Sequence, residues 1–351
     1  MKYAFILPEL KRCGPNNVIK NIINSNAFSA FDIFLICIRS GSDSDYIEEF
    51  RKNKNVKIFQ LCEGGNFTKL MNLKKMLREI HPDVLHSHGF YPDLYVSMVK
   101  GDFKKITTIH NIIFQDYSYR YGKKGYLFAF FHYFLLKVTD FYKVFGCSSE
   151  VSSSLDRVIR LSNLGHVNNG VDIKYFCNLG YDEKKDLKRK LNLDCQVLIA
   201  FCGGVERVKR VPELVNDYIC KIDNLDFKFI IIGSGPELNE IEESKYIKKI
   251  GFVSNPSRYL AAADIVVSNS SSEGYPMAIL ESLASGCKVF LSDIPSHNHI
   301  VNSFPSCAFN IDKLNRSFIL SILDNRLDDS QLYNISSDKM ANNYLREIFS
   351  S

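Results

Sequence analysis

The sequence predicts an α/β protein with two domains, each built on a doubly wound parallel sheet. The chain has 351 residues, more than one ordinary hydrophobic core supports, and this length suits two domains of roughly 150 to 200 residues each. Short apolar runs alternate with segments of helical periodicity, as in parallel sheets covered by helices on both faces. This alternation restarts near the middle of the chain, which indicates two similar sheets.

The first domain is expected over residues 1–175. Its short apolar runs are predicted to be strands, because helical patterns lie between them. These runs are YAFILP (3–8), FDIFLICI (31–38), VKIFQL (56–61), DVLHSH (83–88), KITTIH (105–110) and KVFGCS (143–148).

The second domain is expected over residues 176–336, after the turn-rich segment NNGVDIKYF gives way to a charged helix at 182–193. A last helix, predicted over 337–351, can pack back on the first domain or on the second. The predicted strands of the second domain are QVLIAFCGG (196–204), FKFIIIGSG (227–235), YIKKIGFV (246–253), ADIVVSNS (263–270) and CKVFLSD (287–293).

The arrangement predicts where a ligand binds. In doubly wound sheets, ligands lie where the carboxyl ends of strands meet the first turns of helices. Two such domains facing one another leave a cleft, and we expect the active site there, lined by the loops that follow the strands.

The composition indicates a folded cytoplasmic protein. Ten cysteines are scattered without paired spacing, which favours free thiols in a reducing compartment. The first residues lack the pattern of a signal peptide. The longest apolar run, 127–138, is shorter than the ~20 residues that a membrane-spanning helix needs.

The segment 114–145 is rich in aromatic and basic residues. It contains 13 Phe or Tyr among 32 residues, and Lys and Arg exceed Asp and Glu by five between Lys100 and Phe145. Such a surface suits peripheral contact with an anionic membrane or guidance of a lipid-linked acceptor. A buried core helix with a mobile loop is the alternative, and the sequence does not decide between them. Nucleic acid is disfavoured, because no recognised binding module accompanies the charge.

Two glycine loops follow predicted strands and could hold phosphate. Gly14 comes just before a helix, where amide groups attract anions, although a tight turn explains it equally well. The loop GGVERVKR (203–210) combines Gly204, which lets the backbone approach a ligand, with the cations Arg207, Lys209 and Arg210. A solvated basic helix start is the alternative there. A dinucleotide dehydrogenase is disfavoured, since the Gly-x-Gly-x-x-Gly fingerprint is lacking.

The stretch NSSSEGYPMAILESLASGCKV (269–289) holds two glutamates eight positions apart. Glu273 is predicted in a loop, Glu281 in the helix that follows, and Gly286 at the end of that helix. Both carboxylates can reach one site, and the amides that open the helix can bind an anion. In the alternative, Glu273 caps the helix and Glu281 is a surface residue.

These motifs together resemble those of the family 4 glycosyltransferases, retaining enzymes of the GT-B fold that use nucleoside-diphosphate sugars. The stretch SEGYPMAILESLASGCKVFLSDI is the most specific part of the resemblance. The other matching segments, in the order of the family, are PDVLHSHGF, TTIHN, VNNGVD, FCGGVERVK, FKFIIIGSGPE and KIGFV.

The resemblance implies how the second domain holds a donor. Glu281 binds the ribose hydroxyls, Glu273 contacts the hydroxyls of the donor sugar near the reacting carbon, and Lys209 binds phosphate. The backbone near Val253 contacts the base. The backbone of the segment after Glu273 holds sugar and phosphate. This segment comprises Gly274, Tyr275, Pro276 and Met277.

The resemblance assigns two positions in the first domain. Gly14 faces the diphosphate, and His110 lies near the donor sugar, where it and Glu273 are the expected catalytic residues. His86 and His88 match the HsH segment of the family. We expect no metal site from them, since no further ligands accompany them in a suitable pattern, and the resemblance implies neither a catalytic metal nor another cofactor.

One position departs from the family pattern. Gly204 stands where the family usually has an arginine, and the loss of its charge-assisted hydrogen bond is worth ~1.5 to 3 kcal/mol. The sequence leaves open whether Arg207 or Arg210 replaces it.

The resemblance therefore implies an enzyme, a glycosyltransferase of the hexosyltransferase type. It is expected to act in bacterial surface polysaccharide synthesis, on a lipid-linked or oligosaccharide acceptor, in the cytoplasm or on the inner face of the cell membrane. Two alternatives stay open: a GT-B transferase that makes a soluble glycoside, and a catalytically weak nucleotide-sugar-binding protein, which the absent arginine favours.

Overall fold

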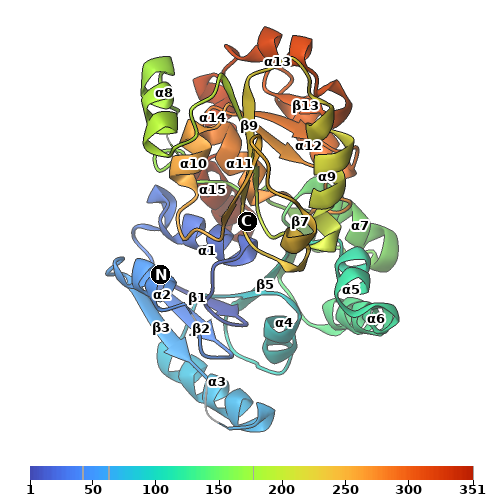
Figure 1. The fold of residues 1–351 in the computed structure, drawn as a ribbon. Helices are drawn as coiled ribbons and strands as arrows, with labels where there is room; N and C mark the ends of the chain where they lie inside the picture. The colour runs from blue at the N-terminus through green and yellow to red at the C-terminus, as the bar shows by residue number, and fades with distance from the viewer. Residues whose placement is uncertain (42, 62–63, 177, 351) are drawn as a thin grey trace. The chain divides into compact units, whose positions relative to one another are not determined.

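The structure is a computed structural model that describes residues 1–41, 43–61, 64–176 and 178–350. The chain divides into two compact domains (Figure 1). The first comprises Met1–Asn169 and Ser337–Ser351, of which Ser351 lies outside the described residues, and the second comprises Gly170–Ser336. The division falls between Asn169 and Gly170, a few residues before the end predicted at 175.

The first domain contains a sheet of seven strands in its described part, in the order β3-β2-β1-β4-β5-β6-β7, and every neighbouring pair is parallel. Its strands are β1 (Lys2–Leu7), β2 (Asp32–Cys37), β3 (Val56–Gln60), β4 (Val84–His88), β5 (Lys104–Ile109), β6 (Lys143–Gly146) and β7 (Leu164–His166). Its helices are α1 (Gly14–Ile23), α2 (Ser44–Arg51), α3 (Asn66–Ile80), α4 (Phe90–Ser97), α5 (Ile113–Tyr121), α6 (Lys123–Val138), α7 (Ser149–Ile159) and α15 (Ser337–Phe349), with a 3₁₀ turn at Asn26–Phe28.

The second domain contains a sheet of six strands in its described part, again all parallel, in the order β10-β9-β8-β11-β12-β13. Its strands are β8 (Val197–Cys202), β9 (Phe227–Ile232), β10 (Ile247–Gly251), β11 (Ile265–Ser268), β12 (Lys288–Leu291) and β13 (Ala308–Asn310). Its helices are α8 (Tyr181–Lys190), α9 (Val211–Asp217), α10 (Ser257–Ala262), α11 (Met277–Ala284), α12 (Pro295–Ser303), α13 (Arg316–Ile322) and α14 (Asp329–Asn334). Its 3₁₀ turns are Arg207–Lys209, Ile219–Lys221, Pro236–Glu240 and Ile311–Lys313.

The strand pattern confirms the predicted fold class. Each of the apolar runs predicted as a strand forms one, and the central strands β1, β4 and β8 are buried almost throughout. Burial on both faces explains why these strands are continuous apolar runs and not alternating ones. The sequence prediction lacked β7 and β13, because each has only three residues and lies at the edge of its sheet.

The last helix, α15, belongs to the first domain. Tyr344 is fully buried there, its hydroxyl lies 3.0 Å from Thr108 Oγ1, and its ring meets Phe145 edge-on at 5.2 Å between centroids. Lys104 Nζ donates to the Ile348 carbonyl at 2.6 Å. These contacts make α15 part of the hydrophobic core on which the first sheet depends.

A buried polar network fastens α5 and α6, which lie side by side in Figure 1, to the first domain. Asp93 on α4 is fully buried and accepts hydrogen bonds from Thr107 Oγ1 at 2.7 Å and from Ser87 Oγ at 2.6 Å. Its other oxygen lies 2.8 Å from His132 Nε2 on α6, and His132 Nδ1 lies 2.9 Å from the Tyr117 hydroxyl on α5. Each buried polar group of the network thus has a partner, as stability requires.

Candidate active site

The loops after β8 and β9 pack backbone to backbone at the carboxyl edge of the second sheet. Gly203 has φ 148° and Gly233 has φ 143°, a region that favours glycine. A Cβ added at Gly233 would lie 1.8 Å from the Gly203 carbonyl oxygen. The glycines therefore hold the basic loop of 203–210 in place. The segment 233–235 after β9 supports this loop.

Lys209 and Glu273 form an ion pair at this edge. The Glu273 side chain is only 12% exposed, and it also accepts a hydrogen bond from Ser270 Oγ at 2.9 Å. Burial raises the pKa of Glu273, but the charge of Lys209 and the hydrogen bonds from Lys209 and Ser270 outweigh it. The pKa lies below its ordinary value, so Glu273 is a carboxylate at neutral pH.

Glu281 lies inside α11, with 7% of the residue exposed. The alternative that made it a surface residue is therefore wrong. Its charge acts on the thiol of Cys202, at the end of β8, which places the carboxylate near the carboxyl edge of the sheet. Glu281 has interactions of its own within the domain.

The N-cap residue of α11 is Pro276, which makes no side-chain capping hydrogen bond. The described partners of the Glu273 carboxylate are Lys209 and Ser270, so the alternative in which Glu273 caps the helix is also wrong. Gly274, Tyr275 and Met277 are buried around this turn. An uncapped helix N-terminus within a buried loop suits a bound anion.

The two arginines of the basic loop have different environments. Arg210 Nε donates to the Asn269 carbonyl at 2.8 Å, and its Nη2 atom lies 3.4 Å from Asn269 Oδ1 and from the Ser270 carbonyl. Arg210 therefore holds the loop before Glu273 in place. The Arg207 side chain is exposed and has no hydrogen bond or ion pair to a residue within the described ranges, so it is available to a ligand.

Gly204 and Val253 are both accessible. The atoms nearest to a Cβ added at Gly204 belong to the Glu206 side chain, at 3.5 Å or more, an ordinary contact. Val253 is half-exposed just after β10. The structure thus places Gly204, Arg207, Lys209, Glu273, the 274–277 turn and Glu281 in or beside loops and helix starts that follow strands of one sheet.

The two predicted positions of the first domain also follow strands. Gly14 is the first residue of α1, where the chain is helical, so a tight turn does not explain it. No side chain caps α1, and Asn16 Nδ2 donates to the carbonyls of Glu9 at 2.9 Å and Lys11 at 2.8 Å, which orders the loop before the helix. His110 comes directly after β5 and is half-buried.

A second histidine, His88, contacts His110. The sequence analysis noted His88 only because it matches the HsH segment of the family. His88 Nδ1, at the end of β4, lies 2.8 Å from His110 Nε2, and the rings stack at 5.1 Å between centroids. His86 lies in the sheet between Tyr3 and Thr108, with its Nδ1 atom 2.9 Å from the Tyr3 hydroxyl and its Nε2 atom 2.8 Å from Thr108 Oγ1. His88 therefore positions His110, whereas His86 belongs to the core.

All three histidines are uncharged at neutral pH. Burial lowers the pKa of His110 to about 4. Burial holds the pKa values of His86 and His88 well below the ordinary range, and repulsion from a second protonated ring would oppose their protonation further. Neutral His110 can accept or donate a single proton, as hydrogen bonding to a sugar hydroxyl requires.

His297 is a neighbour of Glu273 that the sequence analysis missed. It lies near the start of α12, is fully buried, and its ring and the Glu273 carboxylate influence each other electrostatically. The signal that could have found it is its place after the strand CKVFLSD, at the edge where ligands of such sheets bind.

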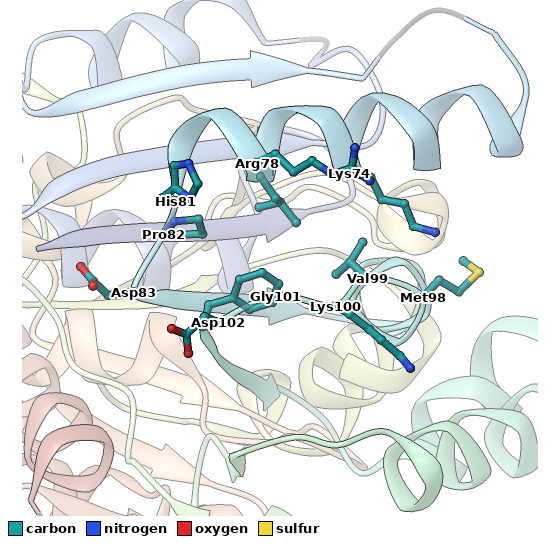
Figure 2. A pocket seen from close by; sticks show the side chains of 12 residues that line it. Lys74, Arg78, His81, Pro82, Asp83, Met98, Val99, Lys100, Gly101 and Asp102 are labelled. Atoms are coloured by element: carbon teal, nitrogen blue, oxygen red, sulfur yellow. The ribbon is translucent and has the colours of Figure 1, made fainter.

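A cavity of about 710 Å³ lies at the amino-terminal ends of β4 and β5 in the first sheet (Figure 2). It opens between the end of α3 and the segments that lead into β4 and β5, and Lys74, Arg78 and Lys100 extend along it. None of the predicted site residues lines this cavity. It therefore plays no part in the site described above.

Among the described residues, no three His, Cys, Asp or Glu side chains gather as metal ligands would. In the same part of the chain, no helix has the length and apolar character needed to cross a bilayer.

Comparison with known proteins places this geometry in a family. The model of Glycosyltransferase Family 4 matches residues 17–175, and the model of Glycosyl transferases group 1 matches residues 196–311. The chain belongs to the family 4 glycosyltransferases. The two matches cover the described strands of both sheets except β1, and they include both glutamates and His110.

Individual relatives agree with the family. The O-antigen biosynthesis glycosyltransferase WclY of Escherichia coli is 27% identical over 98% of this chain and 97% of its own length. The E. coli protein named UDP-Gal:alpha-D-GlcNAc-diphosphoundecaprenol alpha-1,3-galactosyltransferase is 25% identical over 89% of this chain and 84% of its own. The crystal structure of Anabaena HepE with UDP and glucose superposes with a TM-score of 0.74 at 13% identity, over 99% of this chain and 95% of HepE. The fold is GT-B, and the protein is a glycosyltransferase.

The buried histidines predict how stability of this glycosyltransferase depends on pH. His86, His88, His110 and His297 stay neutral in the folded state, whereas in the unfolded chain they take up protons near pH 6.5. The unfolded state therefore binds more protons between about pH 6.5 and 4, so the free energy of unfolding falls with acidification, by up to ~1.4 kcal/mol per pH unit for each histidine. Urea midpoints at pH 7, 6 and 5 measure this.

Variants separate the histidines from other acid-sensitive groups. His86→Gln should show a shallower fall between pH 6.5 and 5 than the wild type, because one buried imidazole is removed. His81→Asn is the matched control, since His81 is exposed with φ 50°, a conformation that asparagine tolerates. Equal slopes in the wild type and His86→Gln would contradict the prediction.

Proposed function

We propose that the protein is a retaining glycosyltransferase of bacterial surface polysaccharide synthesis. It moves a sugar from a nucleoside-diphosphate sugar to a lipid-linked or oligosaccharide acceptor. The names of WclY and of the galactosyltransferase support the class of acceptor, and the complex of HepE with UDP and glucose supports the class of donor.

The observation that carries the proposal is the group of Lys209 and Glu273, both largely shielded from water, and the buried Glu281 beside the start of α11. Two carboxylates and one ammonium group that are largely shielded from water carry a desolvation cost, and such clusters are concentrated at functional sites. A nucleoside-diphosphate sugar offers each of them a partner: phosphate for Lys209, ribose hydroxyls for Glu281 and sugar hydroxyls for Glu273.

Lys209 changes partner when the donor binds. Without a donor its ammonium group neutralises Glu273. A diphosphate carries more negative charge than one carboxylate, so it draws Lys209 away and leaves Glu273 to accept hydrogen bonds from the sugar. The ion pair thus stabilises both carboxylate and ammonium until the donor replaces it.

The chemistry follows from this grip. As the bond between the anomeric carbon and the diphosphate breaks, negative charge grows on the leaving oxygen, where Lys209, Arg207 and the amides of α11 stabilise it. The acceptor oxygen bonds to the anomeric carbon on the same face, and its proton passes to the leaving phosphate. Configuration is therefore retained, and Glu281, occupied by ribose, serves neither as acid nor as nucleophile. His110 and Gly14 keep the roles that the family pattern implies, beside the sugar and the diphosphate.

Glu281→Ala tests the donor grip. We expect binding of the nucleotide to weaken roughly 10- to 100-fold, because a hydrogen bond to a charged group contributes ~1.5 to 3 kcal/mol. Calorimetry against UDP-, GDP-, ADP- and CMP-sugars measures it and identifies the base. Glu242→Ala, an exposed glutamate of the same domain, is the matched control and should bind as the wild type does.

The same panel decides the proposal itself. Release of nucleoside diphosphate when an acceptor is added supports transfer. Binding of no nucleotide sugar would overturn the transferase proposal, and tight binding without release would leave the catalytically weak binding protein as the better description.

Gly204→Arg tests the departure from the family pattern. A Cβ is accepted there, since the atoms nearest to it belong to the Glu206 side chain and lie at ordinary contact distance. We expect the affinity for nucleoside diphosphate to rise up to roughly tenfold, because the guanidinium adds a charge-assisted hydrogen bond. Gly204→Ala should bind as the wild type does. If Gly204→Arg binds no more tightly and Arg207→Ala loses affinity, Arg207 already fills the role.

A membrane contact through α6 completes the proposed function. Leu127, Phe130, Phe131, Phe134 and Val138 lie at helical spacing on one face of α6 and are 55% to 65% exposed. The opposite face of the helix is buried against the domain. The exposed lysines of α6 flank the apolar face, and they are Lys123, Lys124 and Lys137.

The occupant that fits this face is an anionic bilayer. An exposed apolar stripe of this kind is rare on a surface that faces only water, and flanking lysines attract acidic lipid head groups. A protein partner would not need the lysines at the rim. Contact with the bilayer would also bring the enzyme to a lipid-linked acceptor.

Flotation with vesicles tests this contact. The wild type should float with vesicles containing phosphatidylglycerol and stay below with neutral ones. The double variant Phe130→Glu, Phe134→Glu should lose most of the floating fraction, because each charge opposes burial in lipid. The double variant Tyr181→Glu, Tyr333→Glu changes two exposed tyrosines of the second domain and is the control. A wild type that never floats would contradict the contact.

A further inference from the structure

His297 is a buried histidine with one unpaired ring nitrogen. It follows β12 in the first turn of α12, and its side chain is 0% exposed. A buried histidine normally satisfies both ring nitrogens. Here only one of them has a partner among the residues that the structure describes: Nδ1 is paired and Nε2 is not.

The hydrogen bonds around Nδ1 determine the tautomer. Ser292 Oγ donates its single proton to the Ser270 carbonyl at 2.6 Å. It therefore acts as an acceptor toward His297 Nδ1, at 3.0 Å, and the Ser292 carbonyl, at 3.2 Å, is an acceptor as well. Nδ1 must carry the proton, so Nε2 presents a bare lone pair.

The ring stays in this form at neutral pH. Burial lowers the pKa of His297 to about 4, and the negative charge of Glu273 raises it only in part. Nε2 is therefore a buried acceptor that lacks a donor among the described residues.

The same hydrogen bonds connect His297 to the donor site. Ser270, which receives the bond from Ser292, donates its own hydroxyl to Glu273 Oε1 at 2.9 Å. His297 is thus linked through Ser292 to the loop that holds Glu273. Glu273 and His297 each present an acceptor, and a carboxylate and a bare imidazole nitrogen side by side both call for hydroxyl groups.

We propose that Nε2 of His297 accepts a hydrogen bond from a hydroxyl of the transferred sugar, beside Glu273. The inference rests on the proposed function and deepens it, because it names a residue that selects the sugar. When Lys209 moves to the diphosphate, Glu273 is released and the sugar reaches both acceptors. A sugar without the matching hydroxyl leaves Nε2 unpaired, and a site of this kind discriminates strongly against such a substrate.

Binding of UDP, UDP-glucose and UDP-galactose to three variants tests the inference. His297→Phe keeps a planar ring but has no acceptor, and we expect it to bind the preferred UDP-sugar roughly 10- to 100-fold more weakly while its affinity for UDP stays within about threefold. His297→Gln, which can place an amide oxygen near the position of Nε2, should recover part of the loss. Asn298→Ala, on the same helix and bonded to Asp293 by its exposed side chain, is the control and should match the wild type.

Deoxy analogues identify the hydroxyl. Among the 2-, 3-, 4- and 6-deoxy forms of the preferred UDP-sugar, one should bind the wild type as weakly as the parent sugar binds His297→Phe, with no further loss on that variant. Equal losses of UDP and UDP-sugar affinity would show a structural role and overturn the inference. The inference would also be overturned if His297→Phe weakened the binding of every deoxy form by the same factor. That result would assign a water molecule, and not a sugar hydroxyl, to Nε2. Both results leave the proposed function standing, because the wild type still binds and transfers the sugar.

Discussion

Parallel strand direction is the constraint on which the rest of this glycosyltransferase depends. Because each described strand runs parallel to its neighbours, the carboxyl ends of the strands in a sheet share one edge, and each chain return must cross as a helix or loop. Residues that are distant in sequence, such as Lys209 and Glu273, therefore meet there. The glycines at 203 and 233 allow the backbones of these loops to touch, so the polar groups can gather without a Cβ in the way.

In the second domain, the charged side chains near the carboxyl edge of the sheet largely neutralise one another. Glu273 and Lys209 are each other's counterion, Arg210 is committed to the carbonyls of Asn269 and Ser270, and Arg207 extends into solvent. One cation therefore holds the loop, one balances a carboxylate and one is available. This division explains how the chain manages with a glycine at position 204, since the loss of one positive charge falls on a loop that contains three others.

Much of this was predictable from sequence, for identifiable reasons. Buried parallel strands leave continuous apolar runs, so the long strands were found, whereas the three-residue edge strands β7 and β13 left no pattern. The glutamates stood out because a glycine-rich turn and a helix surround them. The sequence could not show that Arg210 points back to its own loop, because the direction of a long side chain depends on partners distant in the chain. His297 escaped notice for the same reason: its single pairing becomes visible only when Ser270 and Ser292 are seen together.

The placement of α15 has a consequence for how the chain acquires its structure during synthesis. The first domain is made of two pieces of sequence, and the whole second domain is translated between them. Tyr344, which meets Thr108 and Phe145 in the first domain, emerges from the ribosome only after residues 170–336. The amino-terminal piece must therefore wait, with part of its core open, while the later domain can fold as an uninterrupted unit. In this protein the domain that is begun first is the one that is finished last.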